Sequence, residues 1–252
     1  TRLAHWPRPL RLSYAGQVLR VKGSEVRPER QFGQAGAELI GAEGSGADVE
    51  AIAVAAEALL GVGVPNLSVD LTMPTLVPAI AEAFDIPRDQ GTALRAALDH
   101  KDAAAVAALG GEAGALLTRL VAASGGAAQA WAALRRLDLP ERARAERDHL
   151  GAVLDGLAAA MPGLMVTVDP VENRGFEYHT GISFTFFAQR GAPGELGRGG
   201  RYDAGDRERP EPATGFTLYT DMILSTLPEA SPRKRLLLPL GTDAAPAAAL
   251  RA

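Results

Sequence analysis

Two stretches near the start of the chain alternate apolar and polar residues with the period of two that is typical of a β-strand. Residues 9–20 form the first stretch and residues 30–40 the second, and the polar segment 21–29 between them predicts a hairpin loop. One side of the second stretch carries two polar residues, Gln34 and Glu38. Amide and carboxylate groups are costly to bury unless they are hydrogen-bonded, so this side either faces solvent or lines a binding site.

The middle of the chain has the composition of helices. Residues 48–60 place apolar residues at helical spacing with Asp48 as the expected N-cap, and residues 67–71 then alternate as a short strand. Alanine and leucine predominate between residues 74 and 160, which favours several short helices. The expected breaks between these helices are Pro87, Gly110-Gly111, Gly125-Gly126 and Pro140.

Strand patterns return after residue 160. The expected strands cover residues 165–169, 182–188, 214–219 and 236–240. A glycine-rich loop, residues 189–200, and a short helix, residues 221–227, connect them, and Asp243 is the expected cap of a final helix. Strands at both ends of the chain around a helical middle predict an α+β fold with a mostly antiparallel sheet.

Composition excludes several classes of protein. The 252 residues include no cysteine, which excludes disulfides and thiolate metal sites, and no apolar run reaches the roughly 20 residues that a membrane span requires. The net charge of −4, from 26 basic and 30 acidic residues, argues against a nucleic acid as the main partner, because phosphate binding needs a basic surface. We therefore expect a cytoplasmic protein. The chain starts at Thr1 without a signal-like segment, so we interpret it as a fragment or as the ordered part of a longer chain.

Generic catalytic motifs are absent from the sequence. Its histidines are His5, His100, His149 and His179. They form no pair at metal-ligand spacing, so we expect no metal site and no cofactor. The glycine-rich segment 197–200 resembles a phosphate-binding loop only superficially, because it lacks the Lys-Ser/Thr pair and the βαβ context of such loops. We interpret it as a flexible turn that presents Arg201 and Tyr202.

Four segments in a fixed order carry a sharper signal. They are residues 19–20 with 30–41 (RQFGQAGAELIG), residues 174–181 (RGFEYHTG), residues 199–203 (GGRYD) and residues 213–216 (ATGF). Together they resemble the catalytic domain of histidyl-tRNA synthetase and its non-catalytic relatives. The first is similar to motif 2 of the class II synthetases, the next two to histidine-specific segments, and the last to motif 3. By itself, the second segment is more typical of a hydrogen-bonded strand edge than of a binding site.

The resemblance covers roughly residues 9–72 and 163–227. It implies a class II aminoacyl-tRNA synthetase-like fold, with an antiparallel sheet flanked by helices and a helical insertion. The expected divisions are a core of residues 1–73 and 161–230, the insertion of residues 74–160, and the start of a truncated C-terminal βα segment in residues 231–252. Motif 1, which forms the dimer interface of class II proteins, would precede Thr1, so dimerisation is implied by the family alone.

The resemblance also implies a set of histidine-binding residues. By position, the candidates are Gln34, Glu38, Arg174, Tyr178, His179 and Tyr202, with His179 standing where the family usually has a second tyrosine. Carboxylate and amide groups suit an ammonium group and an arginine suits a carboxylate, which together match a free amino acid. The pocket either binds histidine or is a relic kept for packing.

The ATP site departs from the family pattern. Arg20 matches the motif 2 arginine on the α-phosphate, but Lys22 stands at the position of the glutamate that reads ATP. Pro28 and Met222 stand at the positions of two further ATP-binding arginines. Losing one contact that stabilises charge in a transition state typically costs about 3–4 kcal/mol. The resemblance with these departures implies a protein that no longer activates histidine.

This combination is similar to the regulatory subunits of ATP phosphoribosyltransferase, which are non-catalytic synthetase paralogues. That resemblance implies that the chain activates the short-form catalytic subunit and mediates histidine feedback in the first step of histidine biosynthesis. The implied partners are the catalytic subunit and a second copy of the chain, as a dimer within a hetero-octamer, with L-histidine as a possible ligand and neither nucleic acid nor membrane. The alternatives are a histidine–tRNA ligase fragment whose motifs have drifted, and an adenylating enzyme for another acceptor.

Overall fold

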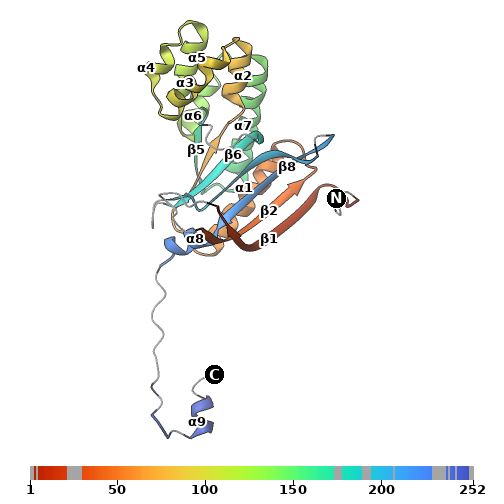
Figure 1. Cartoon of the computed structure of the whole chain (residues 1–252), viewed down its shortest axis with the longest axis vertical. Coiled ribbons are helices and arrows are strands. Elements are labelled where there is room, and N and C mark those ends of the chain that lie inside the picture. Colours follow the sequence, from red (N-terminus) through yellow and green to blue (C-terminus); the bar gives the residue numbers. More distant parts are fainter. Residues whose placement is uncertain are drawn as a thin grey trace.

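The structure, a computed structural model, describes residues 3, 5–21, 30–172, 178–188, 194–206, 208–228, 237, 239–241 and 243–249. Within these residues eight strands form one sheet (Figure 1). In spatial order they are β1 (Leu10–Leu19), β2 (Gln31–Ile40), β8 (Arg209–Tyr219), β7 (Gly197–Asp206), β6 (His179–Ala188), β3 (Leu67–Thr72), β5 (Met165–Asp169) and β4 (Gly125–Gly126). All neighbouring strands are antiparallel except β3 and β5, so the predicted mostly antiparallel sheet is confirmed.

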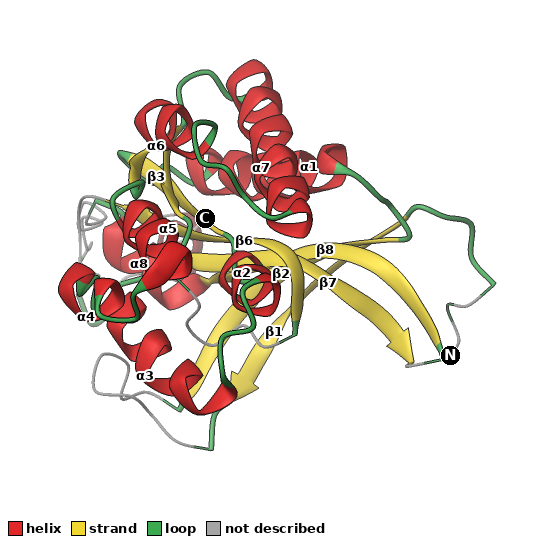
Figure 2. Ribbon diagram, turned by 90° about the horizontal axis from the view of Figure 1, so that it is seen from above, coloured by secondary structure: helices red, strands yellow, loops and turns green. Residues whose placement is uncertain are grey.

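Helices cover one face of this sheet and extend beyond one side of it. The long helices α1 (Ser45–Gly61) and α7 (Glu141–Ala160) pack against each other, and α1 also packs on β2 and β8. Five shorter helices gather beyond β3 and β5 (Figures 1 and 2). They are α2 (Leu76–Ala83), α3 (Arg88–Asp99), α4 (Ala103–Ala107), α5 (Gly111–Val121) and α6 (Ala127–Leu134). The helices expected between residues 74 and 160 are therefore present, while the division of the chain into a core and a helical insertion stays a prediction.

The apolar side of α1 explains its position against the sheet. Ile52 and Leu59 are fully buried and recur at helical spacing on one side of the helix. They belong to one core cluster with Leu71 of β3 and with Phe184 and Phe186 of β6. Because alternate residues of a strand point to opposite faces, this packing leaves the other face of the central strands for polar side chains.

Most elements lie where the sequence predicts them. Strands β1, β2, β3 and β5 match their expected ranges within one or two residues, and β6 begins earlier, at His179. The expected hairpin loop lies almost wholly outside the described residues. Helices α3 and α7 begin directly after Pro87 and Pro140, as expected for residues that cannot continue a preceding helix.

Strand β7 corrects the interpretation of the glycine-rich segment 197–200. This segment is not a flexible turn, because its residues pair with β6 on one side and β8 on the other. Glycine is depleted in strands, which explains the wrong prediction. Tertiary pairing on both sides overrides that local preference. The break expected at Gly125-Gly126 is also a strand, β4, which pairs with β5.

Two further predictions concern the ends of elements. The expected strand 236–240 falls partly outside the described residues, and its described members Leu237, Pro239 and Leu240 are not in a strand. The expected helix after Asp243 is present as α9 (Ala244–Ala249), and α8 (Thr220–Thr226) matches the expected short helix after β8. In the part of the chain described here, no helix is both long and apolar enough to cross a membrane.

Candidate functional site

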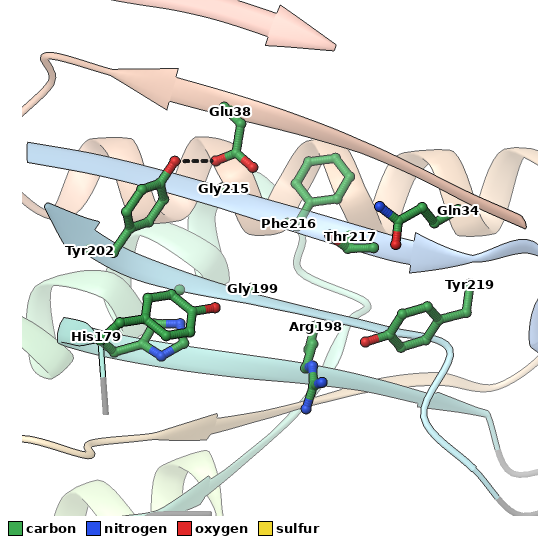
Figure 3. A pocket seen from close by; sticks show the side chains of 12 residues that line it. Gln34, Glu38, His179, Arg198, Gly199, Tyr202, Gly215, Phe216, Thr217 and Tyr219 are labelled. Carbon is green, nitrogen blue, oxygen red and sulfur yellow. Dashed lines mark hydrogen bonds between the residues drawn. The ribbon is translucent and has the colours of Figure 1, made fainter. Parts of the chain in front are cut away.

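A polar cavity of about 260 Å³ lies on the face of the central strands that α1 does not cover. Strands β2, β8, β7 and β6 supply its walls and floor (Figure 3). It is lined by Gln34, Glu38, Tyr178, His179, Arg198, Gly199, Gly200, Tyr202, Gly215, Phe216, Thr217 and Tyr219. Five of the six predicted histidine-binding residues therefore meet at one cavity. The sixth, Arg174, lies outside the described residues.

The floor of the cavity depends on glycines. Gly215 pairs with Glu38 on one side and with Gly200 on the other, so the three residues form one row across the sheet. A Cβ atom at Gly215 would overlap the Glu38 carboxylate, and a Cβ at Gly200 would lie 2.6 Å from Nε2 of His179. The absence of side chains at these positions is what allows polar groups from the neighbouring strands to lie over the sheet.

The Tyr202 hydroxyl donates a hydrogen bond of 2.8 Å to Oε2 of Glu38 across the intervening strand β8. Burial raises the pKa of the Glu38 carboxyl, and the bond from Tyr202 opposes this shift. Burial, together with the hydrogen bond to the neighbouring carboxylate, raises the pKa of Tyr202. Since a carboxylate accepts hydrogen bonds at both oxygens, Glu38 retains acceptor capacity for a cationic ligand group.

Two adjacent rings form the β6 side of the cavity. The rings of Tyr178 and His179 lie 4.2 Å apart, and the ring of Tyr178 meets that of Tyr202 edge to face at 6.2 Å. His179 is buried, whereas Tyr178 is 64% exposed. A register shift in the β6–β7 pairing follows His179, so the strand locally departs from regular pairing where these rings enter the cavity.

Sequence reasoning missed several residues of this site. Thr217 and Arg198 are cross-strand partners next to the glycine row, and the Tyr14 hydroxyl lies 2.5 Å from the Thr217 hydroxyl. Burial raises the pKa of Tyr14. The two-residue period of a strand could have identified them, because it places Arg198, Gly200 and Tyr202 on the same face of β7. Treating the glycine-rich segment as a turn hid that pattern.

The end of the cavity nearest α8 is where the resemblance places ATP. The Arg20 guanidinium lies 4.6 Å from the centre of the Phe32 ring, which meets the Tyr219 ring edge to face. Met222 packs against the core and lies against Gly194, outside the cavity lining. The remaining positions of the expected degenerate ATP site, Lys22 and Pro28, lie outside the described residues.

A buried ionic cluster supports the sheet from the opposite face. Asp48, which is 1% exposed, accepts hydrogen bonds from Arg201 Nε at 3.1 Å and from the Thr214 hydroxyl at 2.8 Å. Its other oxygen lies 2.6 Å from Nε2 of His149 on α7. The prediction that Asp48 caps α1 is therefore wrong. The helix begins at Ser45, and its acidic residue is held by strand side chains instead.

No group of three or more histidine or acidic residues in the described ranges could hold a metal ion. The arrangement instead suits a small zwitterion. A half-buried carboxylate and a phenol meet at one end of the cavity, and an amide and a guanidinium lie toward the other. These groups recognise an ammonium or imidazole group and a carboxylate, respectively.

Comparisons with known proteins identify the family of the chain. The model of the family described as histidyl-tRNA synthetase matches residues 1–223. The chain is 60% identical over 252 residues to an ATP phosphoribosyltransferase regulatory subunit of Paramagnetospirillum magneticum, covering 100% of this chain and 65% of that protein. It is 56% identical over 251 residues to a protein of the same name from Rhodospirillum centenum, covering 100% and 64%. The chain thus spans just under two thirds of these relatives' length.

A solved structure of a related protein has a similar fold. The fold is similar to that of an ATP phosphoribosyltransferase regulatory subunit/histidyl-tRNA synthetase from Bacillus halodurans, with a TM-score of 0.77 and 26% sequence identity. That match covers 90% of this chain and 61% of the other. The fold, the order of the four segments and the family match lead to one conclusion: the chain belongs to the histidyl-tRNA synthetase family.

Proposed function

We propose that this chain is a non-catalytic regulatory subunit of ATP phosphoribosyltransferase. In this proposal it binds the short-form catalytic subunit, activates it, and makes it responsive to L-histidine, the end product of the pathway. It acts in the cytoplasm as a dimer within a hetero-octamer and takes no part in the phosphoribosyl transfer itself. Nucleic acid and membrane have no role in this proposal.

One observation carries the proposal. The residues that suit an amino acid converge on the cavity, with Glu38 and Tyr202 in direct contact, whereas Met222 stands where an ATP-binding arginine is expected. Met222 packs against the core and Gly194, so it offers no charge to a triphosphate. Adenylation depends on charge compensation at the reacting phosphates. A retained amino-acid end and a degenerate nucleotide end fit a sensor better than a ligase.

The relatives support the same assignment. Two proteins that are 60% and 56% identical to this chain are named ATP phosphoribosyltransferase regulatory subunits. At this identity we expect the cavity residues and the partner to be shared. Feedback then requires that histidine bind one state of the assembly more tightly than the other, because a ligand with equal affinity for both states shifts nothing.

The proposal is tested by mixing the purified chain with the short-form catalytic subunit of the same organism. We expect the rate of phosphoribosyl transfer to ATP to rise with the concentration of the chain, to saturate, and to fall when L-histidine is added. An absence of activation at saturating chain concentration would contradict the proposal.

A parallel assay separates the proposal from the ligase alternative. Histidine-dependent exchange between ATP and labelled pyrophosphate reports adenylation, and we expect none above background for this chain. Exchange at a rate comparable to that of a histidyl-tRNA synthetase assayed alongside would contradict the proposal and identify the chain as part of a ligase.

A further inference from the structure

We propose that the ring of Tyr219 forms the end wall of the cavity and limits its occupants to free amino acids, excluding derivatives that are extended at the carboxyl group. The inference rests on the proposed function in one respect, that the cavity binds L-histidine. It adds a residue that determines specificity by size. Tyr219 belongs neither to the four segments of the resemblance nor to the predicted set of histidine-binding residues.

The strand register places Tyr219 and the Glu38–Tyr202 contact at opposite ends of the cavity. Gly215 and Tyr219 share one face of β8, because an even number of residues separates them. Gly215 pairs with Glu38, and Tyr219 pairs with Gln34. Four residues of a strand span about 14 Å. The cavity therefore extends along the sheet from the Glu38 carboxylate to the ring of Tyr219.

The ring of Tyr219 closes its end of the cavity. Tyr219 lines the cavity but is only 3% exposed, and in Figure 3 its ring extends from β8 toward Arg198. Phe32, two residues beyond Gln34 on β2, meets this ring edge to face with 6.0 Å between the ring centres. Phe32 and Arg20, which stacks on it, lie outside the cavity lining. Tyr219 therefore separates the cavity from these two side chains.

The backbone around Tyr219 holds the ring in this position. The N–H of Tyr219 donates a hydrogen bond of 2.8 Å to the carbonyl oxygen of Leu196. Helix α8 begins at the next residue, and its Asp221 accepts a hydrogen bond of 3.1 Å from the N–H of Gly33 on β2. A ligand too long for the cavity must therefore displace a packed ring, which is costly because well-packed sites tolerate no extra volume.

The charges of the cavity determine which end of an amino acid meets the wall. The ammonium or imidazolium group of L-histidine is attracted to the Glu38 carboxylate, whereas its own carboxylate is repelled by it. The carboxyl group therefore points toward Tyr219. The cavity volume of about 260 Å³ is small for a ligand site, where roughly 300–1,000 Å³ is usual. A group added to the carboxyl therefore collides with the ring.

The test uses two esters of L-histidine that differ only in size. Calorimetry measures the affinity of the wild-type chain and of Tyr219→Ala for L-histidine, its methyl ester and its benzyl ester. Both esters lack the carboxylate charge, so their ratio reports space alone. The wild-type chain should bind the methyl ester about tenfold or more tightly than the benzyl ester. Tyr219→Ala should bind the benzyl ester at least as tightly as the methyl ester, because the benzyl ring fills the space that is left.

Three further variants make the result specific. Tyr219→Phe keeps the ring and should keep the wild-type preference. Tyr219→Leu removes less volume, should lose part of the preference, and decides the question if Tyr219→Ala does not fold, since removing a buried aromatic ring destabilises a core. Phe187→Ala removes a ring from an exposed position of β6 outside the cavity lining and should change nothing.

Two results would overturn the inference. The first is a wild-type chain that binds L-histidine but treats the two esters alike, by binding both equally or neither, since its selection would then depend on charge. The second is an unchanged preference for the methyl ester in the variants that lack the ring.

The outcome also separates this inference from the proposed function. Activation of the catalytic subunit by the wild-type chain is measured alongside. Activation without any binding of L-histidine would overturn the role of Tyr219 and leave the regulatory role standing. A preference between the esters that depends on the ring, without activation, would support Tyr219 and overturn the regulatory role.

Discussion

The hydroxyl of Tyr202 donates a 2.8 Å hydrogen bond to Oε2 of Glu38, although the strands that carry these residues are not neighbours in the sheet. Strand β8 lies between them, and Gly215 is the residue of β8 in the row of Glu38. The bond is possible because glycine leaves the surface of β8 bare at that point. The polar end of the cavity is therefore built by side chains that reach over the sheet toward each other.

Removing the Tyr202 hydroxyl should weaken the fold measurably. Tyr202→Phe leaves a half-buried carboxylate without its donor, and we expect the free energy of unfolding to fall by about 1–3 kcal/mol. The matched control is Tyr14→Phe, whose hydroxyl contacts Thr217 at the more exposed edge of the sheet and should cost about 1 kcal/mol or less. Urea denaturation of both variants checks this. An equal loss in the two would contradict a special role for the Glu38 contact.

Glu38 should make stability depend on pH in a defined direction. Burial raises its pKa in the folded chain, so its contribution to stability is fully present below the unfolded value of about 4.3 and is lost as pH rises through the folded value. Glu38→Gln has no charge to lose. The variant should therefore gain stability relative to the wild type as pH rises from about 4 to 7, as measured by denaturation at a series of pH values.

Glu50 serves as the control, because its pKa is shifted in the direction opposite to that of Glu38. Its hydrogen bonds to Arg11 lower its pKa, so its contribution is present above the unfolded value and is lost as pH falls. Glu50→Gln should lose stability relative to the wild type at neutral pH, and this difference should shrink toward pH 4. If Glu38→Gln followed the pH profile of Glu50→Gln, the assignment of Glu38 as a desolvated carboxyl would be wrong.

The floor of the cavity should not tolerate a methyl group. Gly215→Ala places a Cβ against the Glu38 carboxylate and 2.9 Å from the carbonyl oxygen of Ala37, so we expect a loss of about 1–3 kcal/mol and of histidine binding. Gly91 in α3 has no atom within 4 Å of a Cβ position. Gly91→Ala should instead stabilise the chain by up to about 1 kcal/mol. Thermal melts and calorimetry distinguish the two, and unchanged binding by Gly215→Ala would contradict the described floor.

Asp48 should be among the most sensitive positions of the chain. Removing a buried charge partner typically costs about 3–5 kcal/mol, and Asp48→Ala leaves the largely buried Arg201 without its carboxylate. Arg142→Ala, which breaks an exposed pair with Glu82, should cost about 0–1 kcal/mol. Denaturation midpoints compare the variants directly. A cost below about 1 kcal/mol for Asp48→Ala would show that the cluster is dispensable.

Much of the fold was predictable because local pattern and tertiary role agree. The alternating apolar and polar residues predict the ends of β1 and β2 within a few residues. The proline that precedes α7 predicts the start of that helix. The glycine-rich strand β7 was not predictable in this way. Its glycines oppose strand formation locally, but a Cβ at Gly200 would overlap the His179 ring and a Cβ at Gly199 would overlap the Phe184 ring. Asp48 is of a residue type that often caps helices. It binds Arg201 instead because α1 packs on β7 and β8.

The site was predictable only as far as the motifs reach. Gln34, Glu38, Tyr178, His179 and Tyr202 meet at one cavity, which spacing alone would not have shown, because they come from three strands and the turn before β6. Their role in binding histidine stays a prediction. Arg198, Thr217 and Tyr219, which also line the cavity, lie outside the four segments, and they are recognised only when the strand register shows which residues share a face.

The central claim is that the amino-acid end of a synthetase site has been kept while its nucleotide end has been lost. Calorimetric titration of the purified chain with L-histidine and, separately, with ATP tests this most directly. The account predicts saturable binding of L-histidine and no saturable heat with ATP. Saturable ATP binding that L-histidine tightens would contradict it and identify the chain as part of a ligase.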